Sequence, residues 1–270
     1  MAAVNDPSPA RPFEIVVSTL PAWPDPSIAI AGSRAGATGV LNLEHVRDLD
    51  AARSALARLA GQGRGALGVK IAPGSPATRL LAELPPAITL VVVAASAGGG
   101  SDALIAQARA SGRRVWAECT TSQAARMARA AGAEALVAKG HEAGGHVAEE
   151  TTFILLQRLR QEADAPVLAY GGIGLHTAAA ACVGGAAGVV LDAPLALARE
   201  AAIPPSLRAI LERMEGDETV CLGTGVGDLF RVYQRPGMRA VESLRQLEAE
   251  LEGAADGSLR WRDAIEAAVG

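Results

Sequence analysis

A short loop near the middle of the chain holds several side chains that can carry protons. It reads Gly-His-Glu-Ala-Gly-Gly-His over residues 140–146 and directly follows Lys139. Imidazoles titrate near neutral pH, and lysine amines can act as nucleophiles. We expect Glu142 to orient Lys139 or to close the loop through a salt bridge. If the chain carries chemistry, we expect it around this segment.

Lysine is scarce in this chain. The 25 basic residues include only two lysines, Lys70 and Lys139, so the other 23 are arginines. A lysine retained among so many arginines favours a position where a compact, titratable ammonium matters. A desolvated Lys139 near Lys70 would have a lowered pKa and could form a Schiff base with a carbonyl substrate.

Short β-branched runs alternate with segments rich in Ala, Leu and Arg, a pattern typical of parallel α/β folds. The predicted strands are residues 13–18, 38–43, 66–71, 89–94, 114–119, 135–139, 166–170 and 188–192. The predicted helices are residues 27–35, 49–61, 76–84, 102–111, 122–131, 150–162, 176–183 and 194–201. Eight such units predict a (β/α)8 TIM barrel, with an open doubly wound sheet as the competing fold.

The domain organisation follows from these units. Residues 13–202 form the barrel, and the polar, Pro-rich residues 1–12 are expected to be a flexible segment. Residues 203–270 are expected to be a helical C-terminal extension. Within it we interpret the glycine-rich residues 223–227 as a turn, because no convincing strand precedes them and they lack the lysine of a phosphate loop.

Barrel enzymes carry their working residues at the C-terminal ends of the strands. In this chain that rule selects Lys70, Glu118, Lys139, Asp192 and the loop Gly171-Gly172-Ile173. We expect an ion network Lys70–Glu118–Lys139–Asp192, which fits either a catalytic cluster or a plugged, inert barrel. His141 and His176 are weaker rim candidates, the second at the start of a helix.

The loop at 140–146 resembles a segment of the FMN-dependent nitronate monooxygenases, formerly 2-nitropropane dioxygenases, and of the related flavin enoyl-acyl carrier protein reductases. Residues 166–173, Pro-Val-Leu-Ala-Tyr-Gly-Gly-Ile, and residues 25–40 are similar to two further stretches of that family. The chain also looks like the barrel modules of polyketide and polyunsaturated fatty acid synthases. The Pro-rich start would suit excision from a longer multidomain chain.

The resemblance implies a cofactor, FMN, and a role for each matching residue. His146 would be the acid or base over the flavin. Gly144, beside Gly145, and Gly171 would allow the backbone to approach FMN closely. The amides of Gly171, Gly172 and Ile173 would hold the phosphate.

Three strand ends depart from the family pattern. Lys70 stands where the family has Asn, and Lys139 stands where it has Gln. Both are compatible with flavin, because a lysine near its N1 and O2 would stabilise the reduced anion. Residues 190–193, Val-Leu-Asp-Ala, replace a phosphate-binding segment, and Asp192 would repel a phosphate.

The composition limits the classes of partner and the cellular compartment that we expect for this protein. A net charge of −4 without a basic stripe argues against nucleic acid, and no apolar run is long enough to span a membrane. Three widely spaced cysteines, Cys119, Cys182 and Cys221, fit neither a disulfide framework nor a zinc site, so we expect no metal and a cytoplasmic protein. We expect a small-molecule or acyl-carrier-bound substrate, and other domains of a multienzyme or a homodimer as partners.

Three functions remain open at this point. The first is an FMN-dependent oxidoreductase, and the second is a Schiff-base enzyme without flavin. The third is a degenerate barrel that serves as a structural or docking module of a synthase.

Overall fold

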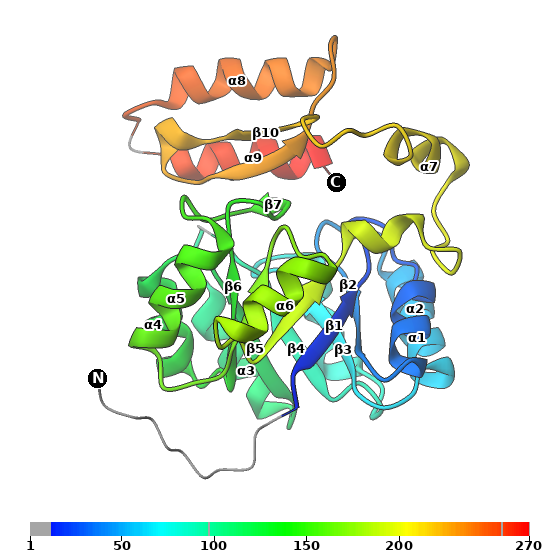
Figure 1. The fold of residues 1–270 in the computed structure, drawn as a ribbon. Helices are drawn as coiled ribbons and strands as arrows, with labels where there is room; N and C mark the ends of the chain where they lie inside the picture. Colours follow the sequence, from blue (N-terminus) through cyan, green and yellow to red (C-terminus); the bar gives the residue numbers. More distant parts are fainter. Residues whose placement is uncertain (1–11, 97, 255, 270) are drawn as a thin grey trace.

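The computed structural model describes residues 12–96, 98–254 and 256–269. Its central feature is a closed barrel of eight parallel strands, as predicted (Figure 1). The strands are β1 Glu14–Ser18, β2 Thr38–Asn42, β3 Leu67–Ile71, β4 Leu90–Val93, β5 Arg114–Cys119, β6 Ala135–Lys139, β8 Val167–Tyr170 and β9 Gly188–Leu191. β1 pairs with both β2 and β9, which closes the ring. Residues 1–11 of the predicted N-terminal segment lie outside the described residues.

Helical segments surround the barrel. They are α1 Ser27–Arg34, α2 Leu49–Gln62, η1 Pro76–Glu83, α3 Ser101–Ala110, α4 Ser122–Ala131, α5 Thr152–Glu162, α6 Leu175–Val183 and η2 Ala193–Leu197. The predicted helices at 76–84 and 194–201 are 3-10 segments instead, each with a proline in its first turn. The Thr121 side chain caps α4 by accepting a hydrogen bond from the amide of Ala124 at 3.1 Å, as Thr and Ser do at helix starts.

The core is aliphatic and lies in two layers. One layer lies between the strands and the helices and includes Leu41, Ile105 and Leu155, which are fully buried. The other lies inside the barrel and includes Val92 and Leu168. Strands buried on both faces explain why their sequences are nearly continuous apolar runs.

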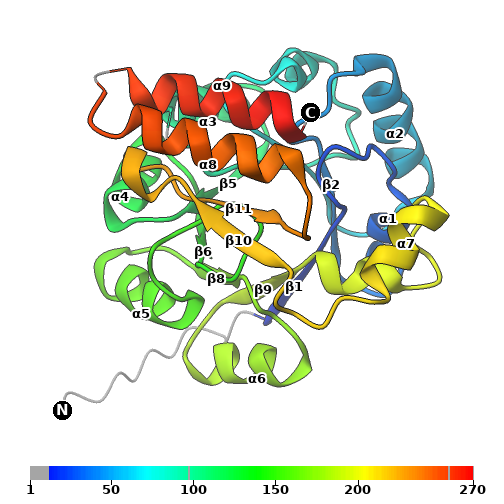
Figure 2. The same ribbon diagram turned by 90° about the horizontal axis from the view of Figure 1, so that it is seen from above.

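The C-terminal extension covers the end of the barrel where the strands finish (Figures 1 and 2). It contains α7 Pro205–Leu211, α8 Arg239–Leu251 and α9 Gly257–Val269, so its predicted helices are present. It also contains an unpredicted hairpin, β10 Thr219–Leu222 and β11 Phe230–Tyr233, which pairs with β7 Gly145–His146. Trp261 is fully buried in the core of the extension, and its indole donates to the carbonyl of Asp228 at 3.0 Å.

Residues 223–227 form a turn, as predicted, but one premise of that prediction was wrong. They lie between β10 and β11, with the short 3-10 segment η3 Thr224–Val226 in their middle. β10 has only four residues, of which only Leu222 is buried, and its pairing partner β11 follows the turn, so periodicity alone did not reveal it. Within the residues that the structure describes, no helix has the length and apolar character needed to cross a membrane.

Candidate active site

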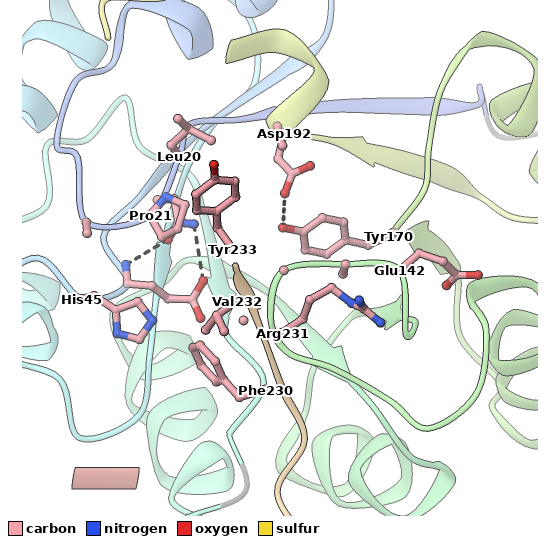
Figure 3. Close-up of a pocket in the computed structure, with 18 of the residues that line it drawn as sticks. Leu20, Pro21, His45, Glu142, Tyr170, Asp192, Phe230, Arg231, Val232 and Tyr233 are labelled. Carbon is pink, nitrogen blue, oxygen red and sulfur yellow. Dashed lines mark hydrogen bonds between the residues drawn. The ribbon is translucent and has the colours of Figure 1, made fainter. Parts of the chain in front are cut away.

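A cavity of about 910 Å³ lies between the mouth of the barrel and the extension (Figure 3). We call it the large cavity. Its walls come from the ends of β1, β2, β8 and β9, from the loop after β6, and from the extension. Figure 3 shows residues 230–233 of β11 lying across it. A closed barrel places its ligand site at this end, and a volume of this size is in the range of small-molecule and cofactor sites.

Glycines form one wall of the large cavity. Cβ atoms built on Gly144 and Gly174 would meet no protein atom within 4 Å, so these two positions leave room for a ligand. Gly171 is different: a Cβ there would lie 2.7 Å from the Thr152 Oγ1 and 2.8 Å from the Ala143 amide nitrogen, and φ is +119°. Gly171 lines the large cavity, so its expected close approach to a ligand stays a prediction, but the protein's own atoms already exclude a side chain at this position.

The loop from Gly171 to Gly174 lines the large cavity. Thr177 Oγ1 accepts from the Gly174 amide at 2.7 Å and donates to the Gly172 carbonyl at 2.9 Å, which fixes the loop against α6. Among the described residues, the amides of Gly172 and Ile173 have no protein acceptor. Free amides beside a helix N-terminus are the groups that hold phosphates in many proteins.

Four charged side chains form a buried ion cluster beneath the large cavity. The Lys70 ammonium lies 2.5 Å from Glu44 Oε2 and 2.6 Å from Glu118 Oε1, and Lys139 lies 3.2 Å from Glu118 Oε2. The amide of Ala95 also donates to Glu118 Oε2, at 3.1 Å. The positive charges of the two ammoniums balance the negative charges of the two carboxylates, because an unpaired charge removed from water would be strongly destabilising.

Mutual pairing sets the ionisation of this cluster. Burial by itself would lower the pKa of Lys70, but the carboxylates of Glu118 and Glu44 outweigh it and raise that pKa. Burial would likewise raise the pKa of Glu44, but the ammonium of Lys70 outweighs it and lowers that pKa. The Schiff-base alternative placed the reacting amine on Lys139. That amine is only 1% exposed and is paired with Glu118 at 3.2 Å, which argues against attack on a carbonyl substrate in the large cavity.

The predicted network was right about Lys70, Glu118 and Lys139 and wrong about Asp192. Asp192 accepts a 2.5 Å hydrogen bond from the Tyr170 hydroxyl (Figure 3), and Glu44 takes its place in the cluster. Glu44 lies two residues beyond the end of β2, outside the predicted strand ends.

Tyr170 separates the two lysines from the large cavity. Both ammonium nitrogens lie 5.4 Å from the centroid of its ring, a cation–π distance. Tyr170 lines the large cavity, whereas Lys70 and Lys139 are 3% and 1% exposed and do not. As these side chains are arranged, neither lysine would contact a flavin ring in the large cavity, contrary to the expectation from the sequence.

His146 lies on β7 and does not line the large cavity. Its Nδ1 lies 2.8 Å from Asp228 Oδ1, and its ring packs edge-on against Phe230, with the centroids 4.8 Å apart. Phe230 lines the large cavity, but His146 lines a separate polar cavity of about 370 Å³ together with residues such as Glu150 and Arg158.

The remaining predicted rim residues have structural partners. Glu142 lines the large cavity, and its Oε2 accepts from the Thr152 amide at 2.9 Å and hydroxyl at 2.8 Å, so it closes the loop by hydrogen bonds and not by the predicted salt bridge. His141 Nδ1 lies 2.9 Å from the Ala148 carbonyl. His176 is exposed in the first turn of α6, and it does not line the large cavity.

Besides Glu44, the sequence analysis missed His45 and Arg231, which also line the large cavity. His45 follows β2, and its Nδ1 lies 3.1 Å from Glu266 Oε1 on α9. Arg231, on β11, donates from Nε to the His141 carbonyl at 2.8 Å. One of only four histidines, His45 comes just after a predicted strand, so the strand-end rule could have selected it.

Comparison with solved structures places the barrel among known relatives. FabK from Thermotoga maritima superposes with a TM-score of 0.74 at 27% identity, covering 88% of this chain and 75% of that one. A nitroalkane oxidase from Streptomyces ansochromogenes shares the fold, with a TM-score of 0.68, 22% identity, and coverage of 96% and 87%. So does the enoyl reductase domain of MlnA from the macrolactin cluster of Bacillus amyloliquefaciens, with a TM-score of 0.66, 11% identity, and coverage of 88% and 67%.

A comparison with curated protein sequences returned no match. The family model described as nitronate monooxygenase, in contrast, matches residues 50–256, well over half of the chain. The predicted resemblance is thereby confirmed, and the protein belongs to the nitronate monooxygenase family.

Proposed function

We propose that this protein is an FMN-dependent oxidoreductase that binds the cofactor in the large cavity. The observation that carries the proposal is the glycine-lined wall, where Gly144 and Gly174 leave open space and two backbone amides lack protein acceptors. When bound, FMN would supply two-electron redox chemistry. Membership of the nitronate monooxygenase family supports this cofactor.

The protein's own groups would hold the cofactor at two places. The amides of Gly172 and Ile173, next to the N-terminus of α6, would receive the phosphate. The hairpin residues Phe230 and Val232 give the large cavity an apolar wall, which suits a flat aromatic ring system and keeps water away from it.

Asp192 limits how tightly a phosphate can bind. It lines the large cavity, and one like-charge contact at 4 Å costs about 4 kcal/mol at an effective dielectric of 20. The hydrogen bond from Tyr170 holds the Asp192 side chain at the wall of the large cavity. We therefore expect FMN to bind weakly compared with a relative that has a neutral residue at this position.

The family resemblance assigns proton transfer to His146. For this role the His146 imidazole would have to reach the large cavity past Phe230, because the rings of His146 and Phe230 are in edge-on contact. The hydrogen bond to Asp228 would hold the imidazole in one tautomer, as a carboxylate does for a catalytic histidine.

A second function is favoured by the buried ion cluster. Glu118 neutralises both lysines, and the cluster fills the mouth of the barrel beneath Tyr170. This arrangement also fits a barrel retained as a docking module of a synthase. Such a module would not bind FMN.

The visible absorption spectrum of the purified protein separates the two functions. An FMN protein would be yellow, or would shift the absorption bands and quench the fluorescence of added FMN. Riboflavin, which lacks the phosphate, is the matched control and should bind more weakly than FMN. A colourless protein that leaves both spectra unchanged at millimolar flavin overturns the FMN proposal and favours the docking module.

A further inference from the structure

A second, much smaller cavity lies inside the barrel, next to the buried ion cluster. Its volume is about 10 Å³, and we call it the small cavity. Five valines form its apolar part, and Ser18, Lys70, Trp116 and Glu118 form its polar part. Every residue that lines it is at most 8% exposed, so the small cavity is enclosed by protein.

Trp116 brings a buried hydrogen-bond donor to this place. The residue belongs to the core inside the barrel and is 4% exposed, and among the described residues its indole N–H has no acceptor. The other two tryptophans of the chain each have one. Trp23 donates to the Ala202 carbonyl at 2.9 Å. Trp261 donates to the Asp228 carbonyl at 3.0 Å. A buried donor without an acceptor is destabilising, so we expect Trp116 to have a partner that is not a protein atom.

The other polar groups of the small cavity can each make a further hydrogen bond. The Lys70 ammonium has three N–H groups, and its contacts with Glu44 and Glu118 occupy two of them. Lys70 is the only partner of Glu118 Oε1 among the described residues, and a carboxylate oxygen can accept two hydrogen bonds. The Ser18 hydroxyl donates to the Thr19 carbonyl at 3.3 Å and keeps its lone pairs as acceptors. The small cavity therefore offers two donors, on Trp116 and Lys70, and two acceptors.

We propose that the small cavity is a binding site for one water molecule. The water accepts hydrogen bonds from the Trp116 indole and the Lys70 ammonium, and it donates to Glu118 Oε1 and Ser18 Oγ. A volume of roughly 10–15 Å³ is the least that admits a water, and buried waters make about three hydrogen bonds. The site is thus large enough for one water and has the polar partners that hold it.

The balance of donors and acceptors selects water over an ion. A small cation would meet the Lys70 ammonium, and a halide would meet the Glu118 carboxylate, so either would add an unfavourable contact between like charges in a site removed from solvent. Water matches two donors and two acceptors without adding charge. It would link the ion cluster to the indole of Trp116. The inference does not depend on the proposed function, because the small cavity and the large cavity are different sites.

The three indole N–H groups allow a direct test by NMR. Water–protein NOE and ROE spectra of the 15N-labelled full-length protein report which indole protons lie beside a long-lived water, and Trp116→Phe assigns the Trp116 signal by removing it. We expect a cross-peak between water and the Trp116 indole proton. Trp261 is the internal control, because it is fully buried and its indole already donates to a protein carbonyl, so it should show none.

A variant that fills the small cavity separates a bound water from proton exchange through a side chain. Val137 lines the small cavity, and Val137→Ile adds a methyl-sized group that would displace the water while Ser18 and Lys70 remain. The cross-peak should then disappear. Exchange relayed through the Ser18 hydroxyl or the Lys70 ammonium would instead leave it in place.

The stability of the same variant gives a second readout. Val93→Ile is the matched control, because Val93 is as buried as Val137 but packs in the core between the strands and the helices. Val137→Ile should shift the unfolding equilibrium toward the unfolded state by about tenfold more than Val93→Ile, since it leaves the Trp116 indole without an acceptor. A dry cavity predicts the reverse, because filling a void improves packing.

The outcomes decide the proposal. It is overturned if the wild-type protein shows no cross-peak at Trp116, if the cross-peak survives in Val137→Ile, or if Val137→Ile is at least as stable as Val93→Ile. Should Val137→Ile fail to fold, a crystal structure of the wild-type protein decides. Electron density for a water within hydrogen-bonding distance of Trp116 Nε1 would support the site, and a dry cavity would overturn it.

Discussion

The hydroxyl of Tyr170 donates a 2.5 Å hydrogen bond to Asp192, and this contact ties the end of β8 to the residue that follows β9. Burial, and then the charge of Asp192, raises the pKa of Tyr170 well above its usual value, so the phenol stays protonated and acts as the donor. The bond is as short as charge-assisted O–H···O bonds are. It fixes a negative charge on the wall of the large cavity, where a phosphate would also bind.

Replacing that charge should strengthen FMN binding. In Asp192→Asn the like-charge repulsion is lost while the shape is kept, and we expect FMN to bind about tenfold tighter, which corresponds to about 1.4 kcal/mol. Fluorescence quenching of FMN measures this affinity. Riboflavin affinity should not change, and Tyr170→Phe, which keeps the charge, should not reproduce the gain. An equal gain for riboflavin would show that Asp192 does not lie near the phosphate.

Two glycines should separate a ligand effect from a folding effect. A Cβ at Gly144 would point into open space, so Gly144→Ala should keep the free energy of unfolding within about 0.5 kcal/mol and weaken FMN binding. Gly171→Ala should lower the free energy of unfolding by about 1–3 kcal/mol, because φ is +119° and a Cβ would meet the Ala143 amide nitrogen. Urea denaturation and FMN titration of both variants check this. Equal loss of stability in both would contradict the prediction.

Glu118 should be essential for the stability of the barrel. It is the only carboxylate within salt-bridge distance of Lys139 among the described residues, so Glu118→Ala leaves that buried ammonium unpaired. Removing one member of a buried pair costs about 3–5 kcal/mol in the free energy of unfolding. Urea denaturation measures it, with Glu134→Ala as the control, because Glu134 pairs with Arg114 at the exposed surface. If Glu118→Ala unfolds no more easily than Glu134→Ala, the cluster does not carry this stability.

The buried ion cluster should set the pH range in which the folded protein is most stable. The folded pKa of Glu44 is lowered below its ordinary value of 4.5, so its contribution is fully present above about pH 4.5 and is lost as the pH falls toward the folded pKa. The folded pKa of Lys70 is raised above 10.5, so its contribution is fully present below about pH 10.5 and is lost as the pH rises above that value. Denaturant midpoints measured from pH 3 to pH 11 check both limbs.

A variant identifies the group behind the acidic limb. Glu44→Gln removes the titrating carboxylate, so its stability should fall less steeply below pH 4.5 than that of the wild type, although it starts from a lower value. An acidic limb of unchanged slope would assign the effect to other carboxylates.

The residue pattern alone determined the architecture. Apolar runs spaced by helical segments predicted all eight barrel strands, because each strand is buried on both faces and must be nearly continuous in apolar residues. The strand-end rule also selected Lys70, Glu118, Lys139, Gly172 and Asp192, all of which lie at the barrel mouth. These are local properties, and a local pattern is sufficient to reveal them.

The tertiary structure alone decided which of these residues face one another. Glu44 joins the cluster in place of Asp192, and the pairing of β7 with a hairpin more than 80 residues away places His146 opposite Phe230, where it lines the polar cavity. His45 meets Glu266 across 221 residues of sequence. Such contacts depend on how the extension packs against the barrel, and the periodicity of the sequence contains no information about that packing. The sequence therefore determined where the site lies, and the packing of distant segments decided which side chains enter it.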